Sequence, residues 1–444
     1  MHYYGTAAKN QSGHLEIGGV DTVDLAREFG TPLYVMDEAV LRQNCRAYVG
    51  AFRKHYPNFA VAYASKAFLC TAMAALVDQE SMSLDVVSGG EIATALNAGF
   101  PMERTYFHGN NKTVAEIELA LKVGVGRIVV DSVHELELLN RMSGSLGYVP
   151  KIFLRLTPGV GAHGHHYVST GQLDSKFGIP IETGDAFEAT KQALSLPHVE
   201  LKGFHCHIGS QIHDMGGYKI AAQRMLRFVA DVKEQLGFDA RELNLGGGLG
   251  VRYTEEDTTK TPEALVSFMT QTVKRCCAEY GLELPKLIIE PGRSIVGEAG
   301  TTLYTIGTVK EIPGIRTYIS IDGGMGDNIR PALYQAVYES TVANKMDVPE
   351  EKVVTVAGRF CESGDMLLHD VKVANTVDTG DILAVFTTGA YNYSMASHYN
   401  RYPKPAVVFV ADGKAELVVR RESFEDMAAF DLVPEHLRAA KGSK

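Results

Sequence analysis

The sequence predicts an α/β protein with a (β/α)8 barrel of the TIM-like kind and a second, mostly β domain. Two observations carry this prediction. Eight short apolar runs alternate with amphipathic helix patterns from about residue 39 to residue 300. After residue 300, strand patterns continue without long helices between them. Alternating strands and helices are typical of a parallel sheet, and eight regular units favour a closed barrel over an open doubly wound sheet.

The barrel strands are expected where short apolar runs are followed by Gly, Ser or charged residues. These runs are FAVAYA (59–64), SLDVVS (83–88), TYFHG (105–109), RIVVDS (127–132), KIFLRL (151–156), LKGFHCH (201–207), ELNLG (242–246) and KLIIE (286–290). Helix patterns such as GEIATALNAG, TVAEIELALKVG and PEALVSFMTQTVKRCCAEY separate them. The helix pattern at residues 39–55 precedes the first strand and can complete the ring, so the barrel is expected over residues 37–300.

The second domain is predicted from the strand patterns that follow the barrel. They are TLYTIGTVKEI, TYISID, VVTVAG, MLLHDVKVANTV, DILAVFTT and AVVFVADGKAELVVRR. Asp412-Gly413 lies between two alternating apolar runs and predicts a hairpin turn. The N-terminal runs HLEIGGV and TPLYVMD can add strands, so this domain is expected to be discontinuous, at residues 1–36 and 301–444.

Composition limits the partners and the location of the protein. The chain has 444 residues and a net charge of −10, which disfavours binding to nucleic acid or to an anionic membrane surface. No run reaches the ~18 apolar residues of a membrane helix, and the N-terminus lacks a signal-peptide pattern. The six cysteines form no CxxC pair. A reduced, cytoplasmic protein is expected.

Polar residues gather where the predicted strands end, which is where barrel enzymes place their active sites. The strand ends carry Lys66, then His205, His207 and Ser210, then Gly246, Gly247 and Gly248, and finally Glu290, Gly292 and Arg293. Taken alone, Lys66 fits a solvated surface charge as well as a catalytic group. Four strand ends that converge on one mouth favour catalysis.

The glycine run predicts the cofactor. LNLGGGLG (243–250) lacks the GxGxxG order of a dinucleotide site, but its glycines let the backbone approach an anion. Phosphate sites in barrels lie after strands seven and eight. A lysine together with a phosphate site predicts pyridoxal 5'-phosphate, with Glu290 at the pyridine nitrogen and His207 stacked on the ring. The run AHGHH (162–166) lacks the spacing and the partner carboxylate of a metal site, so no metal is predicted.

Longer motifs place these residues in a known family. YASKAF (63–68), SLDVVSGGE (83–91), FHGNNK (107–112), DSKFGI (174–179), HCHIGSQ (205–211), NLGGGLG (244–250), EPGRSIV (290–296), IRPALY (329–334), CESGD (361–365) and GAYNYSMAS (389–397) resemble diaminopimelate decarboxylase. That family belongs to the fold-type III pyridoxal phosphate enzymes, alongside ornithine decarboxylase and alanine racemase. The resemblance covers about residues 30 to 410.

The resemblance implies a role for each matched residue. Lys66 matches the Schiff-base lysine, and Cys361 matches the proton donor. Cofactor contacts are implied for His207, Ser210, Gly246, Gly247, Gly248, Glu290, Gly292, Arg293 and Tyr391. Substrate contacts are implied for Arg293, Arg330, Tyr334, Glu362 and Tyr391. In this family Cys361 and Glu362 reach across a homodimer interface, so a homodimer with shared active sites is expected. The chain departs from the family pattern at Arg359-Phe360, where Gly-Pro is more usual before CESGD, and at Gly323, where Ala is common in Asp-Ala-Gly.

The resemblance implies that the substrate is meso-2,6-diaminopimelate, which gives L-lysine and carbon dioxide in the last step of lysine biosynthesis, and the charged residues agree with it. Arg293 and Arg330 can bind a distal carboxylate, and Glu362 can meet a distal ammonium group. A substrate with an amino acid at each end satisfies both charges. Ornithine or lysine would leave the two arginines unpaired.

Two other classes stay open at this stage. One is another enzyme on the same scaffold: a decarboxylase of a basic amino acid or of a carboxylated polyamine precursor, or an amino-acid racemase. A racemase prefers arginine where Glu290 stands. The other is a non-catalytic homologue, which typically loses the lysine or the proton donor, and this chain has both.

Overall fold

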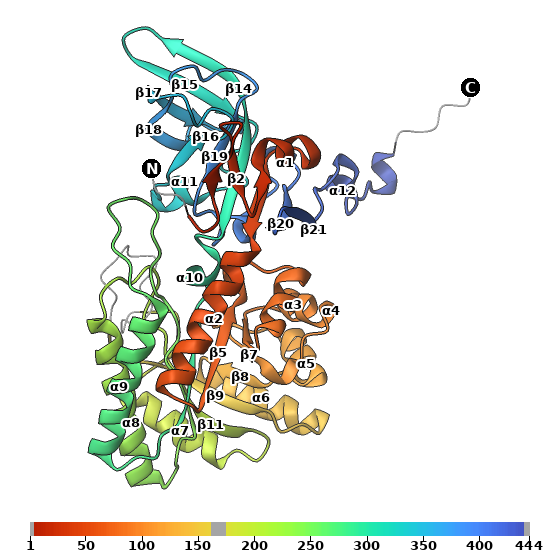
Figure 1. The fold of residues 1–444 in the computed structure, drawn as a ribbon. Helices are drawn as coiled ribbons and strands as arrows, with labels where there is room; N and C mark the ends of the chain where they lie inside the picture. Colours follow the sequence, from red (N-terminus) through yellow and green to blue (C-terminus); the bar gives the residue numbers. More distant parts are fainter. Residues whose placement is uncertain (1–3, 161–174, 439–444) are drawn as a thin grey trace.

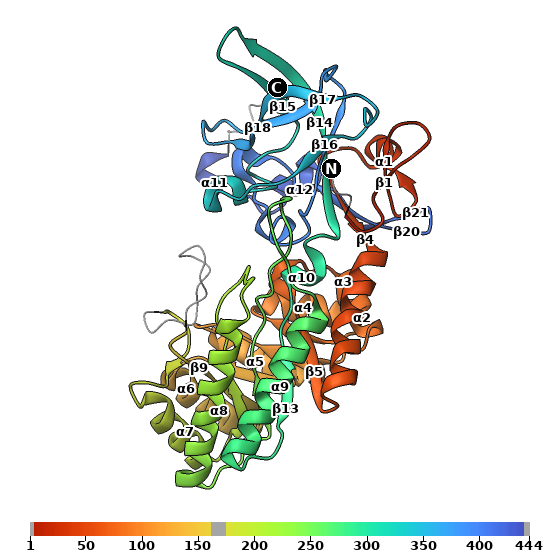
Figure 2. The ribbon, with the colours of Figure 1, turned by 60° about the vertical axis from the view of Figure 1, so that its left-hand side comes forward.

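The computed structural model describes residues 4–160 and 175–438. Figure 1 shows two lobes, one made of parallel strands surrounded by helices and one rich in β-strands. The first and last described segments of the chain both belong to the β-rich lobe, and helix α10 (Arg293–Val296) lies where the two lobes meet (Figures 1 and 2). The chain therefore enters the barrel from the β-rich lobe and returns to it.

The barrel is closed. Its strands are β5 (Phe59–Ala64), β6 (Ser83–Val86), β7 (Thr105–Phe107), β8 (Arg127–Val130), β9 (Lys151–Thr157), β11 (Glu200–His205), β12 (Glu242–Asn244) and β13 (Lys286–Ile289). Neighbours in this order are parallel, and β13 pairs with β5 to complete the circle. A short strand, β10 (Ile179–Pro180), adds to the edge of β9. Each of the eight predicted strands is confirmed, and with them the fold class.

Helices cover the outside of the barrel. They are α2 (Glu38–His55), α3 (Thr71–Gln79), α4 (Gly89–Asn97), α5 (Val114–Val123), α6 (Val133–Leu146), α7 (Asp185–Ser195), α8 (Gly216–Leu236) and α9 (Pro262–Tyr280). Local sequence sets their ends. The side chains of Ser88, Thr113 and Ser132 accept hydrogen bonds from backbone N–H groups of the first turn. Gly124 and Gly281 end their helices with left-handed backbone, which glycine adopts without strain.

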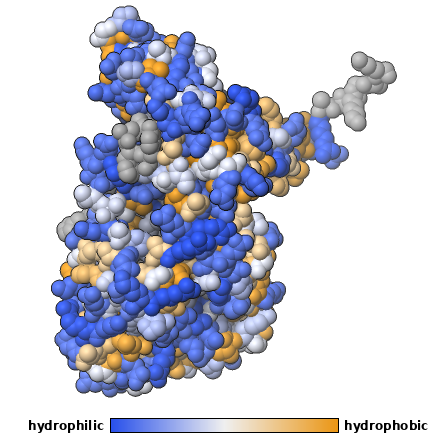
Figure 3. Space-filling view, viewed as in Figure 1, coloured by the Kyte–Doolittle hydropathy of each residue, from blue (hydrophilic) through white to orange (hydrophobic). Residues whose placement is uncertain are grey.

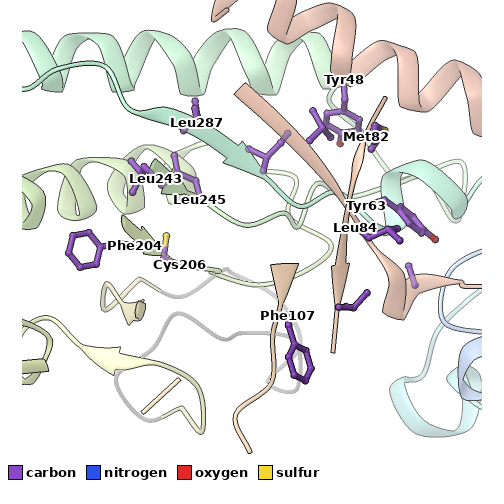
Figure 4. Packing of buried hydrophobic residues seen from close by; sticks show 14 of the residues in the cluster. Tyr48, Tyr63, Met82, Leu84, Phe107, Phe204, Cys206, Leu243, Leu245 and Leu287 are labelled. Carbon is purple, nitrogen blue, oxygen red and sulfur yellow. The ribbon is translucent and has the colours of Figure 1, made fainter. Parts of the chain in front are cut away.

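Apolar side chains on the outer face of the strands pack against these helices. Figure 4 shows Tyr63, Leu84, Phe107 and Leu287 from the strands, together with Tyr48 from α2, in one buried cluster. Alternate residues point into the barrel. Ala62, Tyr106, Val129, Phe153 and Ile288 form a separate buried cluster. This inner cluster fills the middle of the barrel, and the polar groups that line the cavity lie beyond it at the C-terminal mouth.

The β-rich lobe combines strands from both ends of the chain. They are β4 (Leu33–Asp37), β14 (Gly300–Ile312), β15 (Arg316–Ile321), β16 (Ser340–Val342), β17 (Glu350–Ala357), β18 (Met366–Ala374), β19 (Ile382–Val385), β20 (Ala406–Ala411) and β21 (Lys414–Val419). Strand β4 lies between β14 and β20. The predicted hairpin joins β20 to β21, with positive φ angles of 50° at Asp412 and 75° at Gly413.

The run HLEIGGV does not join the sheet that contains TPLYVMD. It contributes β2 (Leu15–Ile17) and β3 (Val20–Asp21), which pair with β1 (Ala8–Lys9) in a separate three-stranded sheet. Short helices α1 (Thr22–Phe29), α11 (Arg330–Tyr334) and α12 (Phe424–Ala428) complete the lobe. The exact domain boundaries stay a prediction. Within residues 4–160 and 175–438, the structure has no helix with the length and apolar character needed to cross a membrane.

Candidate active site

A cavity of about 1150 Å³ opens at the C-terminal ends of the barrel strands and reaches the β-rich lobe. Eight of the residues predicted for the site line it: Lys66, His207, Ser210, Glu290 and Arg293 from the barrel side, and Arg330, Tyr334 and Tyr391 from the other. Residues more than 300 positions apart in the sequence therefore share one cavity. The structure confirms that these strand ends converge.

Lys66 follows strand β5 directly, in the short 3-10 helix η1 (Ser65–Ala67). Its two neighbours, Ser65 and Ala67, are buried, whereas Lys66 is exposed to the cavity. The backbone beside it is held by the β-rich lobe. The N–H of Tyr391 donates to the carbonyl oxygen of Ala67 at 2.8 Å, and Ser394 Oγ donates to the same oxygen at 3.0 Å. Both lobes thus fix the position of the lysine.

Three side chains surround the carboxylate of Glu290 at the end of β13. Oε1 accepts a hydrogen bond from Asn244 Nδ2 at 2.6 Å and lies 2.8 Å from His108 Nε2. Oε2 lies 3.0 Å from His205 Nε2. Burial raises the pKa of Glu290, but the two histidines lower it by a larger amount. The resulting pKa lies well below the ordinary value of a glutamate. Glu290 is therefore held as an anion.

Two histidines of the cavity, His205 and His207, are neutral at pH 7. Burial lowers the pKa of His205 to about 4, so His205 donates its Nε2–H to Glu290 as a neutral ring. Burial, and then the charge of Lys66, lower the pKa of His207 well below the ordinary value. One ligand atom from each of His108, His205 and Glu290 lies within 4.8 Å of the others, so these three side chains can also ligate a metal ion.

Ser210 and Arg293 lie together at one corner of the cavity. Arg293, the first residue of α10, is buried, and its Nε and Nη2 donate to Ser210 Oγ at 3.3 and 3.1 Å. Its Nη1 donates to the hydroxyl of Tyr253. The sequence motifs place Arg293 in both the cofactor and the substrate sets, and the structure shows it in contact with Ser210, a residue predicted to bind the cofactor.

The glycine run lies behind this corner, where no side chain fits. A methyl group at Gly247 would lie 1.9 Å from the carbonyl oxygen of Glu290, and one at Gly248 would lie 2.3 Å from that of Gly209. The N–H of Gly247 donates to His207 Nδ1 at 3.3 Å. Gly292 is also close to the first strand, since a methyl group there would lie 2.9 Å from Cβ of Ala64. Gly246, Gly247, Gly248 and Gly292 thus bring the ends of β5, β11, β12 and β13 together without lining the cavity themselves.

Arg330 is buried in α11, and its guanidinium lies over two of the rings that Arg293 also contacts, those of Tyr253 and Tyr391. Its Nε donates to Tyr338 at 2.8 Å, and its guanidinium lies over the rings of Tyr253, Tyr334 and Tyr391 at 5.8, 5.4 and 5.8 Å. Aromatic rings stabilise a cation whose hydration has been removed. A positive charge is therefore maintained in a nearly dry part of the site.

Several residues that line the cavity were not predicted from the sequence. The two-residue alternation of side chains along each barrel strand would have identified most of them. Asp85, His108, Arg155 and Tyr253 all line the cavity. Because the inner cluster contains Tyr106 and Phe153, the residues two positions further along, His108 and Arg155, point the same way at the mouth. Among the described residues, the buried Oδ1 of Asp85 has no hydrogen-bond partner, and His108 Nε2 lies 3.7 Å from it. Asp85 leaves an acceptor available to whatever fills the cavity.

Cys361 and Glu362 do not join the other predicted residues. Both are exposed on the loop between β17 and β18, and neither lines the cavity of its own chain. The N–H of Cys361 donates to Asn400 Oδ1 at 2.8 Å. The run AHGHH and Asp174 of DSKFGI lie outside the described residues.

Known proteins that are similar to this chain belong to a family of pyridoxal-dependent decarboxylases, which agrees with the residues found in the cavity. The family model described as the pyridoxal-dependent decarboxylase, pyridoxal binding domain, matches residues 42–297. Diaminopimelate decarboxylase of Bacillus subtilis strain 168 is 50% identical over 432 residues, which cover 97% of this chain and 98% of that protein. The chain belongs to the diaminopimelate decarboxylase family. A second family member, from Halalkalibacterium halodurans, is 51% identical over 97% of this chain and 98% of its own length.

Solved structures of the diaminopimelate decarboxylase family have the same fold. The enzyme of M. jannaschii in complex with L-lysine has a TM-score of 0.90 at 36% identity, covering 98% of this chain and 99% of that one. The Helicobacter pylori enzyme with L-lysine has a TM-score of 0.84 at 32% identity, covering 92% and 98%. A lysine/ornithine decarboxylase of Vibrio vulnificus shares the fold, with a TM-score of 0.75 at 23% identity, over 88% and 97% of the two chains.

Proposed function

We propose that this protein uses pyridoxal 5'-phosphate to decarboxylate meso-2,6-diaminopimelate to L-lysine and carbon dioxide, the last step of lysine biosynthesis. One observation carries the proposal: a single cavity contains a lysine, an anionic buried carboxylate and two buried arginines that lie over the same two tyrosine rings. The family to which the chain belongs supports it, since its close relatives are named for this activity.

The residues present fit the cofactor. Lys66 offers an amine, Ser210 and Arg293 offer hydrogen-bond donors for a phosphate, and His207 offers a neutral ring for stacking. Glu290, kept anionic by His108 and His205, would hold a proton on the pyridine nitrogen. When bound, the cofactor supplies an electron sink for the electron pair that remains at Cα after carbon dioxide leaves.

The charge pattern selects the substrate. Arg330, held by Tyr338 and surrounded by aromatic rings, is placed to bind a carboxylate at the far end of the substrate. Because Arg293 contacts Ser210, it orients the cofactor phosphate and can share the substrate carboxylate. The anionic Glu290 disfavours a racemase, which prefers a cationic residue at the ring nitrogen. Ornithine would leave Arg330 without an anion.

A proton must take the place of carbon dioxide at Cα. Cys361 is the proposed donor and Glu362 the proposed contact for the distal ammonium group. Since both are exposed and absent from their own cavity, the proposal includes a homodimer in which each chain supplies them to the other's site. The six cysteines are all free thiols, which supports a reducing, cytoplasmic location.

A substrate panel tests the function. The purified protein is incubated with pyridoxal 5'-phosphate and one amino acid at a time, and carbon dioxide release is measured. We expect release from meso-diaminopimelate at a rate far above that from ornithine, lysine or arginine. Faster release from any of these basic amino acids would refute the substrate assignment. A change in the configuration at Cα without carbon dioxide release would indicate a racemase.

A further inference from the structure

The C-terminal arm, residues 424–438, projects from the β-rich lobe (Figure 1). It contains α12 and the 3-10 helix η6 (Glu435–Leu437). Every residue from 428 to 438 is exposed. The arm follows β21 and extends outward from the β-rich lobe on the side where α3 and α4 lie (Figure 1). It contributes nothing to the cavity or to the cores of the two lobes.

The exposed side chains of the arm include large apolar groups. Phe430 is 95% exposed, Leu432 91% and Phe424 79%, and Val433 and Leu437 are also exposed. In Figure 3 hydrophobic residues lie among hydrophilic ones on this projecting segment. Apolar side chains that gather on one exposed segment mark a surface that another molecule covers. The water-exposed arm is therefore incomplete without a partner.

The arm nevertheless has a defined conformation. Ser423 and Asp426 form a capping box at the start of α12, and Arg420 pairs with Asp426 at the same point. A helix of this length is not stable by itself in water, because the free energy needed to order the first turn exceeds what the hydrogen bonds of one turn contribute. The capping contacts thus present the apolar side chains of the arm in a fixed arrangement.

The arm and the loop of Cys361 are attached to the same short segment, residues 399–401. Arg401 Nη2 donates to the carbonyl oxygen of Met427 at 2.5 Å and to Asp431 Oδ2 at 2.8 Å. From the other side, Asn400 accepts the hydrogen bond of the Cys361 N–H, and Tyr399 stacks on Phe360 at 6.0 Å. The position of Cys361 is therefore coupled to the position of the arm.

These observations identify the molecule that covers the arm. We propose that the C-terminal arm packs on a second copy of this chain and so holds the Cys361 loop at the active site of that copy. The proposal rests on the proposed function, because Cys361 and Glu362 must reach a partner's cavity. The arm is attached to segment 399–401, which also contacts the loop of Cys361 and Glu362, so we infer that a copy that receives Cys361 lies beside the arm. Phe430 and Leu432 supply the apolar contact that an interface needs at its centre.

A double variant tests this surface. In Phe430→Ser with Leu432→Ser, we expect the dimer dissociation constant to rise about tenfold or more, measured by sedimentation over a range of protein concentrations. The control is Ile315→Ser, because Ile315 is 79% exposed at the tip of the β14–β15 turn, away from the arm. It should leave the constant unchanged. Carbon dioxide release by the double variant should fall on dilution in step with the dimer fraction, while cofactor absorbance persists.

Two outcomes would overturn the proposal: an unchanged dissociation constant in the double variant, or an equal rise in the control. Amide hydrogen exchange of the unmodified chain gives a second measurement that needs no substitution. Amides of residues 424–438 should become protected as concentration raises the dimer fraction, and arm amides that exchange freely in the dimer would refute the contact. A different result would contradict the proposed sharing of active sites between two chains. In that case the unmodified protein would decarboxylate its substrate at full rate as a monomer.

Discussion

At the scale of single residues, the site depends on charges placed by burial. Lys66 is the one exposed member of its three-residue 3-10 helix, and Glu290 is kept anionic by neighbours that the sequence motifs did not assign. His205 is neutral because burial lowers its pKa to about 4. Each of these properties has a direct test.

Lys66→Ala should abolish covalent attachment of the cofactor, because it removes the amine that lines the cavity. Borohydride reduction of the protein with pyridoxal 5'-phosphate, followed by mass spectrometry, should show a phosphopyridoxyl group on the unmodified chain and none at this position in the variant. Lys54→Ala, at an exposed residue paired with Glu263, is the control and should keep the group. A variant that still carries the added mass at the active site would remove Lys66 from its role.

His205 should make the fold sensitive to acid. In the unfolded chain its pKa is about 6.5, against about 4 in the folded protein. Above pH 6.5 neither state takes up the proton, whereas between pH 6.5 and 4 only the unfolded state does, so stability is lost as the pH falls. The slope is about 1.4 kcal/mol per pH unit.

The variant His205→Gln isolates this effect, because glutamine keeps a donor for Glu290 but does not titrate. From pH 6.5 to pH 5 the unmodified protein should lose on the order of 2 kcal/mol of unfolding free energy relative to the variant. Urea unfolding at several pH values measures the difference. If the unfolding free energies of the unmodified protein and the variant change with pH in the same way, His205 does not remain neutral in the folded state.

At the scale of strands and loops, the ends of β12 and β13 approach so closely that only glycine fits between them. Gly247→Ala would put a methyl group 1.9 Å from the carbonyl oxygen of Glu290. We expect a loss of roughly 1–3 kcal/mol of stability and about tenfold weaker cofactor binding, measured by urea unfolding and by cofactor titration. The control is Gly50→Ala in α2, where a methyl group meets nothing within 4 Å. It should stabilise the protein by about 0.5–1 kcal/mol, and equal behaviour of the two variants would contradict the packing argument.

The barrel elements were predictable because each strand of a closed parallel barrel is buried on both faces and reads as a short apolar run. FAVAYA and KLIIE show this clearly, and both form strands at the predicted places. The hairpin at Asp412-Gly413 was predictable from turn chemistry alone. By contrast, β16 is a three-residue strand, and its place is decided by pairing with β19, which lies about 40 residues away in the sequence. Local sequence contains no information about such a partner.

The candidate site was predictable where motifs are long and unpredictable where a single residue acts through space. Lys66, His207 and Glu290 follow strands and lie in family motifs. His108 belongs to the motif FHGNNK, but the sequence does not show what it contacts. In the folded protein its Nε2 lies 2.8 Å from Glu290, which is distant from it in the sequence. Tyr253 has no motif signal, and its contact with Arg293 is purely tertiary.

At the scale of the whole molecule, the proposed shared site predicts complementation between two inactive variants. Cys361→Ala should turn over slowly and Lys66→Ala not at all. After the two are dissociated, mixed in equal amounts and reassociated, half of the dimers contain one of each chain, and each of these has one complete site. Carbon dioxide release should recover to about a quarter of that of the unmodified protein. Activity no greater than that of the separate variants would refute the sharing of Cys361.

Strand β4 has a consequence for how the protein is made. Its five residues are all buried between β14 and β20, which the ribosome produces more than 260 residues later. At about 5–20 residues per second, Leu33–Asp37 therefore wait on the order of tens of seconds for both neighbours. The barrel can close during translation, but the sheet around β4 cannot. A nascent chain arrested before β20 would display an unpaired apolar strand, the kind of segment that chaperones bind.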